Sequence, residues 1–203
     1  MENGGTIIWL DLTDSTNDEA RRRLSGLANL SVVAAREQTA GRGQGDHTWS
    51  SEPGENLTFS WVLQSPPLPP VAAADLLLIT QLVTRGLCEY LQQKGVNARI
   101  KWPNDIYVGD RKICGILIEN VLEGGRLRAS IIGIGLNLNQ SRFPAELPNP
   151  VSLRQLTGEH YGLEDELVRL HATLKKSAAL LETQEGRTEL GRYFDALVFR
   201  REA

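Results

Sequence analysis

The sequence predicts an α+β protein in which a mixed, largely antiparallel central sheet is flanked by helices. Strand-like segments cluster in the middle of the chain, and helical segments gather near its ends. Short glycine-containing turns between neighbouring middle segments indicate hairpins. Of the 203 residues, 41% are hydrophobic and 23% are charged, so we expect one domain with a sizeable core over residues 1–203.

In the first third of the chain, short apolar segments alternate with capping and turn signals. Ser15 with Asp18, or Thr16 with Glu19, has the spacing of a capping box, which predicts the start of a helix. The segment that ends at residue 64 alternates apolar with polar residues, which is typical of a half-buried strand. We expect strands at residues 6–12, 30–36 and 56–64, and a helix that continues to about residue 27.

Later in the chain, glycines mark the ends of the expected elements. Gly95 follows a long apolar helical pattern and predicts its end. The turn Glu123-Gly124-Gly125 joins two apolar segments as a hairpin, and Gly109-Asp110 marks another turn. We expect helices at residues 71–94, 164–185 and 188–199, and strands at residues 98–102, 106–108, 112–119 and 127–138.

Composition and charge argue against several classes of protein. The net charge of −3 gives no basic footprint for nucleic acid. The longest apolar stretch, residues 71–83, contains polar side chains and does not resemble a membrane span. Cys88 and Cys114 form neither a disulfide framework nor a metal-binding spacing, so we expect buried thiols in a reducing cytoplasm. We therefore expect a cytoplasmic protein without a DNA or membrane partner.

A glycine-rich loop follows the second expected strand. Gly41, Gly43 and Gly45 would let the backbone approach a ligand and turn its N–H groups toward an anion. Arg42 adds a planar cation suited to phosphate or carboxylate. The loop is neither a dinucleotide-binding motif nor a Walker loop. On the glycines alone, a flexible hairpin loop is the better interpretation.

A second polar cluster lies at residues 101–105 (KWPND), where Pro103 ends a strand. Lys101, Asn104 and Asp105 together could hold an anionic substrate and a magnesium–phosphate group. An ordinary strand end with Trp102 in the core explains the same residues equally well.

Other candidate residues are ambiguous when each is taken alone. Lys112 would be a further cation, and Gly115 within an apolar strand suggests close approach of a ligand, but an ordinary hairpin with a solvated lysine is favoured. Asn137 could bind a base or a phosphate, or serve as a buried turn amide. Trp49 could stack on adenine, although a core tryptophan is commoner. Residues 14–17 could bind a small polar group or only cap a helix.

The order of these motifs closely resembles the catalytic domain of biotin–protein ligases. The resemblance covers residues 6–139, and KWPND is its most specific motif; the helical part at residues 164–199 is compatible but carries none. The resemblance implies the fold shared with class II aminoacyl-tRNA synthetases. The motifs, in order, lie at residues 14–17, 38–43, 49, 101–105, 111–117 and 133–137.

The resemblance implies an ATP-dependent ligase reaction in two steps. Biotin attacks the α-phosphate of Mg²⁺-bound ATP, forming biotinyl-5'-AMP and pyrophosphate. A lysine of a biotin carboxyl carrier protein or domain then attacks the acyl-adenylate and releases AMP. No covalent enzyme intermediate is needed. The family also forms homodimers through sheet edges.

The resemblance also implies roles for particular residues. Arg42 would neutralise charge on the α-phosphate, Lys101 would bind the carboxylate-derived oxygen, and Asp105 would orient Lys112 or support Mg²⁺. The implied catalytic residues are Arg42, Lys101, Asp105 and Lys112. The implied biotin contacts are Ser15, Thr16, Asn17, Gln38, Arg42, Gly43, Gln44, Lys101, Gly115 and Ile116. The implied ATP contacts are Gly41, Arg42, Trp49, Asn104, Lys112 and Asn137.

The chain departs from the family pattern at residues 44–47 (QGDH), where many members continue with a second arginine, a glycine and another basic residue. Fewer cations should hold biotinyl-AMP less tightly. We also expect neither an N-terminal DNA-binding domain nor a C-terminal β-barrel. Two alternatives are a lipoate ligase or octanoyl transferase, which shares the fold, and a non-catalytic biotin- or nucleotide-binding sensor.

Overall fold

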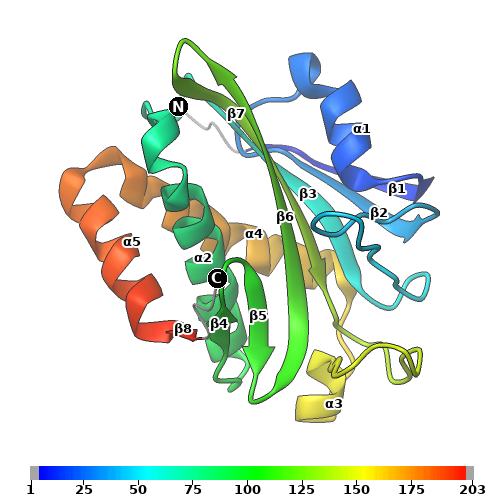
Figure 1. Ribbon diagram of the computed structural model, residues 1–203. Helices are drawn as coiled ribbons and strands as arrows, with labels where there is room; N and C mark the ends of the chain where they lie inside the picture. The colour runs from blue at the N-terminus through cyan, green and yellow to red at the C-terminus, as the bar shows by residue number, and fades with distance from the viewer. Residues whose placement is uncertain (1–4, 200–203) are drawn as a thin grey trace. The chain divides into compact units, whose positions relative to one another are not determined.

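The computed structural model describes residues 5–199 (Figure 1). It divides into two compact units. The N-terminal unit comprises the chain up to Leu76 together with Ile116–Gly135, and the C-terminal unit comprises the rest. Hydrogen-bonded strands follow the order β1-β2-β3-β7-β6 in the former and β6-β5-β4-β8 in the latter. Parallel pairs (β1/β2, β4/β8) occur beside antiparallel ones (β2/β3, β4/β5, β5/β6), which confirms the predicted mixed sheet of an α+β protein.

In the N-terminal unit, α1 packs on the sheet through small and branched apolar side chains. Ala20 of the helix is fully buried against Val33, Val62 and Ile131, which come from three strands. Removal of this apolar surface from water stabilises the unit. The elements are β1 (Ile7–Thr13), α1 (Thr16–Arg22), β2 (Val32–Gln38), β3 (Leu57–Gln64), and most of β6 (Arg111–Glu123) and β7 (Arg126–Leu136).

The predicted half-buried strand at residues 56–64 is wrong in its burial, because β3 is buried on both faces over Leu57–Leu63. Its polar side chains tolerate the interior because they are hydrogen-bonded. The hydroxyl of Thr58 donates to the carbonyl oxygen of Ala35, and the hydroxyl of Ser60 contacts polar groups of α1. An alternating polar pattern therefore marks a buried polar layer beneath α1 rather than solvent.

The structure corrects the predicted helix after β1 in two ways. Ser15 is the N-cap residue, but its side chain makes no capping hydrogen bond, so the capping-box prediction is wrong. The N–H of Thr16 instead donates to Oε1 of Gln38 at 2.8 Å. The helix also ends at Arg22 rather than at residue 27, since the chain tightens into a 3₁₀ turn over Leu24–Gly26.

The predicted helix at residues 71–94 begins later than expected. The carbonyl oxygen of Val71 accepts a hydrogen bond from the N–H of Leu127, and Ala73–Asp75 forms a 3₁₀ turn, so regular helix starts only at Leu77. The end is as predicted, because Gly95 adopts a φ of 75° just after the last helical turn. Early backbone hydrogen bonds to β7 thus replace the first helical turns.

The C-terminal unit contains helices and a short strand that the sequence does not predict. The predicted helix at 164–185 is interrupted at Leu180–Glu182, and Thr183 starts a new helix by accepting a hydrogen bond from the N–H of Gly186. Neither α3 nor β8 was predicted. The elements are α2 (Leu77–Gln93), β4 (Arg99–Lys101), β5 (Asp105–Val108), α3 (Leu153–Thr157), α4 (Leu163–Ala179), α5 (Gln184–Leu197) and β8 (Val198–Phe199).

The remaining predicted strands are present, although their ends differ. Most bounds move by one or two residues, but β6 runs on to Glu123 instead of ending at residue 119. The predicted hairpin is confirmed, because Gly124 and Gly125 both have positive φ between β6 and β7. Among the residues that the structure describes, none lies in a helix long and apolar enough to span a membrane.

Candidate functional site

The start of α1 brings together four residues that the sequence singles out. Ser15, Thr16 and Asn17 are almost completely buried at the junction of β1 and α1. The hydrogen bond from the N–H of Thr16 to Gln38 fixes this junction against the end of β2. The carboxylate of Asp14 accepts from the N–H of Ser15 at 2.7 Å. The local backbone is therefore held by side chains on both sides of the turn.

Asn17 is oriented by a second set of hydrogen bonds. Its Nδ2 donates to Oε2 of Glu119 at 2.8 Å and to the carbonyl oxygen of Leu117 at 3.4 Å, while its Oδ1 lies 2.5 Å from the hydroxyl of Ser60. A Cβ at Gly133 would lie 2.5 Å from Oδ1 of Asn17. Glycine at this position of β7 therefore permits the amide to pack against the strand.

The glycine-rich loop forms a closed hairpin. Arg42 pairs with Thr48 as an antiparallel bridge, the N–H of Gly43 donates to the carbonyl oxygen of His47, and the N–H of Trp49 donates to that of Gly41. A Cβ on Gly41 would lie 2.4 Å from the carbonyl oxygen of Trp49. Gly41 and Gly43 thus serve close backbone packing, and the N–H of Gly43 is used within the hairpin rather than turned toward an anion.

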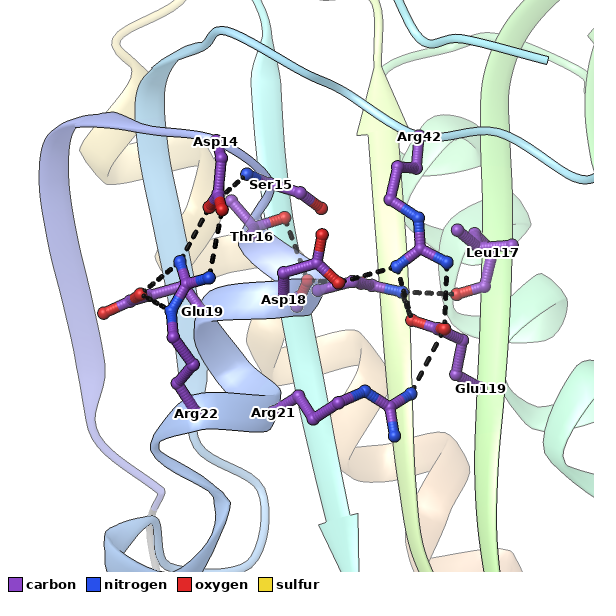
Figure 2. A network of polar contacts seen from close by, with 12 residues as sticks. Asp14, Ser15, Thr16, Asp18, Glu19, Arg21, Arg22, Arg42, Leu117 and Glu119 are labelled. Carbon is purple, nitrogen blue, oxygen red and sulfur yellow. Dashed lines mark hydrogen bonds and ion pairs between the residues drawn. The ribbon is translucent and has the colours of Figure 1, made fainter. Parts of the chain in front are cut away.

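The guanidinium of Arg42 lies between two carboxylates (Figure 2). Its Nη1 is 2.7 Å from Oδ1 of Asp18, and its Nη2 is 3.2 Å from Oε1 of Glu119. Arg21 also contacts Glu119, at 3.1 Å. A phosphate would have to compete with these carboxylates to bind Arg42. We refer to residues 14–23, Arg42 and Glu119 as the α1 network.

Charge and burial oppose one another at Glu119. Burial alone would raise the pKa of this carboxyl, but the hydrogen bond from Asn17 and the charges of Arg42 and Arg21 outweigh it, so its pKa lies below the ordinary value. At the exposed edge of the α1 network, a hydrogen bond from Arg22 likewise lowers the pKa of Asp14. These contacts therefore favour the ionised forms of Glu119 and Asp14.

Trp49 is half-buried and lies against β7. A Cβ on Gly135 would be 2.2 Å from Cε2 of its ring, so glycine is needed for the ring to pack there. Ile116, at the start of this unit's part of β6, is buried. The roles proposed for both residues toward ATP and biotin stay predictions.

In the C-terminal unit, one face of β4, β5 and the start of β6 carries two lysines. Strand register places Lys101 opposite Asp105 and Tyr107 opposite Lys112, so the four side chains share a face. Nζ of Lys112 lies 2.8 Å from Oδ1 of Asp105, as expected if Asp105 orients Lys112. We refer to Lys101, Asp105, Tyr107 and Lys112 as the lysine face.

Lys101 is held differently from Lys112. Its ammonium donates a hydrogen bond of 3.5 Å to the phenol oxygen of Tyr107 and lies 5.3 Å from the centroid of the same ring. Within residues 5–199, the structure gives Lys101 no carboxylate within salt-bridge distance. It therefore presents an uncompensated positive charge on the lysine face.

Several other predicted residues have plainly structural surroundings. Asn137 is buried, and its Nδ2 donates to the carbonyl oxygen of Val151, as expected for a turn amide. Trp102 is 37% exposed and meets Phe194 edge to face, so a core position for it is wrong. Cys88 and Cys114 are buried free thiols, as predicted; burial raises the pKa of Cys88 to about 12 and that of Cys114 further.

Tyr107, Glu119, Asp18 and Ser60 are contact residues that the sequence reasoning missed. Tyr107 could have been found from strand alternation, because it lies two residues after Asp105 and must share its face. Glu119 contacts Arg42 across a sequence separation of 77 residues, which no local pattern reveals.

No three metal-binding side chains come together in the described part of the chain. Asp105, the predicted support for Mg²⁺, is ion-paired with Lys112. This donor set does not match the several oxygen ligands that Mg²⁺ requires, so the residues on the lysine face do not make a protein-held metal site.

Comparison with known proteins gives one family for most of this chain. Residues 9–137 match the model of the biotin/lipoate A/B protein ligase family. The chain is 37% identical to the bifunctional ligase/repressor BirA of Bacillus subtilis over 161 residues, covering 77% of this chain and 48% of that protein. It therefore spans about half the length of that relative.

In two further comparisons, this chain covers most of the length of the other protein. The biotin–[acetyl-CoA-carboxylase] ligase of Paracoccus denitrificans is 34% identical, covering 84% of this chain and 72% of that protein. The solved biotin protein ligase of Aquifex aeolicus in complex with biotin and ATP superposes with a TM-score of 0.80 at 25% identity, covering 96% of this chain and 78% of that one. The fold is thus shared along almost the whole described chain.

Proposed function

The chain belongs to the biotin/lipoate A/B protein ligase family, and we propose that it is an ATP-dependent biotin–protein ligase. It activates biotin as biotinyl-5'-AMP and transfers the biotinyl group to a lysine of a carboxylase biotin carrier domain. Support comes from a relative named as a biotin–[acetyl-CoA-carboxylase] ligase and from the likeness to a biotin protein ligase solved with biotin and ATP.

In the first step, a carboxylate oxygen of biotin attacks the α-phosphorus of ATP. The bond from that phosphorus to the bridging oxygen breaks, and pyrophosphate leaves. Lys101 lies close to the carboxylate-derived oxygen and stabilises the negative charge that develops there. Lys112, kept in place by Asp105, meets the phosphates. Catalysis rests on positioning and charge stabilisation, and Mg²⁺ would supply further charge neutralisation at the phosphates of ATP.

The α1 network supplies the contacts to biotin in this proposal. Ser15, Thr16 and Asn17 offer hydroxyl and amide groups to the polar ring end, and Gln38 secures the turn that presents them. Arg42 leaves Asp18 and Glu119 to meet the α-phosphate. In the second step, the carrier amine attacks the acyl carbon of biotinyl-5'-AMP. The bond from that carbon to the phosphate oxygen breaks, and AMP leaves with this oxygen.

The observation that carries the proposal is the charge on Lys101, which no described carboxylate neutralises and which stands ready for an anionic substrate. The test is conversion of labelled ATP to AMP and pyrophosphate, followed by transfer to a carrier domain. We expect conversion with biotin and none without it. Binding of biotin without any ATP turnover would instead support a non-catalytic sensor.

A lipoate ligase or octanoyl transferase is the rival within the same family. Thermal unfolding with biotin, lipoate and octanoate separates the two, because a ligand raises the unfolding temperature only if it binds the folded state. We expect a rise with biotin alone. A rise with lipoate but not biotin would reject the proposed substrate.

A cytoplasmic location, which rests on the two free cysteines, and a homodimer joined through sheet edges, which rests on the family resemblance, complete the proposal. Sedimentation velocity with and without biotin and ATP tests the dimer. A single monomer species over the whole concentration range would exclude it.

A further inference from the structure

Among the described side chains, Tyr107 is the one that makes a hydrogen bond and a cation–π contact with the ammonium of Lys101. The hydroxyl accepts the hydrogen bond and the ring face lies beneath the cation, so both parts of the side chain contribute. A cation over an aromatic ring is attracted by the ring quadrupole, and the attraction strengthens as the site becomes drier. Tyr107 thereby restricts where the lysine can point.

Tyr107 is itself held rigidly. Its side chain is 5% exposed, and its ring meets the ring of Phe199 edge to face with centroids 6.0 Å apart. Its backbone lies in the middle of β5, between Arg99 of β4 and Lys112 of β6. A flexible lysine that rests on this fixed ring loses less freedom when a ligand binds, because part of its ordering is already complete.

Lys101 and Lys112 differ in the charge of the side chain that each contacts, because Tyr107 is neutral and Asp105 is a carboxylate. A carboxylate partner fixes Lys112 but cancels its charge, so an anion must compete with Asp105. Asp105 lies directly opposite Lys101 in the ladder, yet its carboxylate is engaged by Lys112. Tyr107 fixes Lys101 without cancelling its charge, and two of the three ammonium donors stay available for an anion.

We propose that Tyr107 is a positioning residue for Lys101, whose ring and hydroxyl hold the ammonium in place while leaving its charge free for the reacting carboxylate. This role deepens and rests on the proposed ligase function. The Lys112–Asp105 pair assists, because it draws away the carboxylate that would otherwise neutralise Lys101.

The test compares ring variants that keep their packing. Tyr107→Phe removes the hydroxyl, and Tyr107→pentafluorophenylalanine also removes the attraction of the ring for a cation. We expect a two- to threefold loss of kcat for biotinyl-AMP formation with the first and about a tenfold loss with the second. The KM values for biotin and ATP should change less than about twofold, because Lys101 acts mainly on the transition state.

Tyr90 provides the matched control. It is fully buried in the same unit, carries the ammonium of Lys94 at 5.6 Å from its ring, and donates its hydroxyl proton to Glu166. The same two replacements at Tyr90 should alter stability but leave kcat of the folded enzyme unchanged. Equal effects at both positions would show that Tyr107 is only structural.

Two results would overturn the proposal in distinguishable ways. If the wild-type protein forms no adenylate from biotin and ATP, the ligase function fails and the role of Tyr107 fails with it. If the wild type is active and both Tyr107 variants keep the wild-type kcat, the ligase function stands and the positioning role is rejected. Thermal unfolding of each variant confirms that the compared proteins are folded.

Discussion

The α1 network and the lysine face treat positive charge in opposite ways. In the α1 network, Arg21, Arg22 and Arg42 each contact a carboxylate in the structure (Figure 2). On the lysine face, Lys101 rests on a neutral tyrosine instead. The arginines of the α1 network are therefore ion-paired, whereas Lys101 on the lysine face can bind an anion without first losing a carboxylate.

The difference has an energetic consequence for ligand binding. Arg21 and Arg42 are partly exposed, and their ion pairs with Glu119 contribute only about 0–1 kcal/mol each. A phosphate can displace these carboxylates at a small cost in free energy. The net free energy of phosphate binding is then only the difference between the new ion pair and the one that is lost. Among residues 5–199, no carboxylate lies within salt-bridge distance of Lys101 to compete in this way. Loss of Lys101 should therefore affect catalysis more than changes to the α1 network.

The strongest test of this comparison is Lys101→Ala. We expect the rate of biotin-dependent pyrophosphate release to fall by about 10²- to 10³-fold, because a charge aimed at the reacting oxygens is lost. A continuous assay of pyrophosphate release measures the effect. Lys94→Ala, which removes a lysine bound to Glu166, is the control and should affect stability instead. Near-normal release by the Lys101 variant would remove the central assignment.

The family resemblance implied that Asp105 orients Lys112, and this contact is a local one. The Lys112–Asp105 pair spans a short hairpin, so neighbouring motifs place both residues on one face. β8 could not be predicted, because its two residues are a strand only through pairing with Ile100 and Lys101, almost 100 positions earlier.

Burial was the harder quantity to predict from sequence. The alternating pattern of β3 suggested a solvent-facing side, since nothing local reveals that Ser60 meets Thr16 and Asn17. The candidate residues at 15–17 were found because of their composition and order. Their hydrogen-bond partner Glu119 was not, because the strand register that brings it to Asn17 depends on the whole sheet.

Crowding at β7 gives the next largest expected effect. Gly133→Ala would force Asn17 to move, because the new Cβ would lie 2.5 Å from its Oδ1. We expect the free energy of unfolding to fall by about 1–3 kcal/mol and biotin binding to weaken. Urea unfolding and calorimetry measure the two. Gly26→Ala, which meets no atom within 4 Å, is the control; an equal loss there would show that crowding is not the cause.

The hairpin loop offers a smaller change in charge. Gln44→Arg adds the cation that many family members carry after Arg42, and it should slow dissociation of biotinyl-AMP by about five- to tenfold through a charge-assisted contact. Release of the labelled adenylate from preloaded enzyme measures this rate. Gln92→Arg, at the exposed end of α2, adds the same charge elsewhere and should have no effect. Equal dissociation from wild type and Gln44→Arg would disprove the idea of a leaky loop.

The smallest expected effect concerns Glu119→Gln, which keeps an oxygen acceptor for Asn17 but removes the charge shared by Arg42 and Arg21. We expect the free energy of unfolding to fall by about 1 kcal/mol at neutral pH. Because the pKa of Glu119 is lowered in the folded state, the wild-type advantage is complete above the ordinary value of 4.5 and disappears as the pH falls through the lowered pKa.

Urea unfolding of wild type and Glu119→Gln at a series of pH values measures this convergence. Glu123→Gln, at an exposed carboxylate of the same strand, makes the same change of charge and should cost little at any pH. The free Arg42 of Glu119→Gln should also lower the KM for ATP by about twofold, because one competing carboxylate is gone. A KM that rises instead would mean that Glu119 positions Arg42 for ATP, and that the α1 network is preorganised rather than merely neutralised.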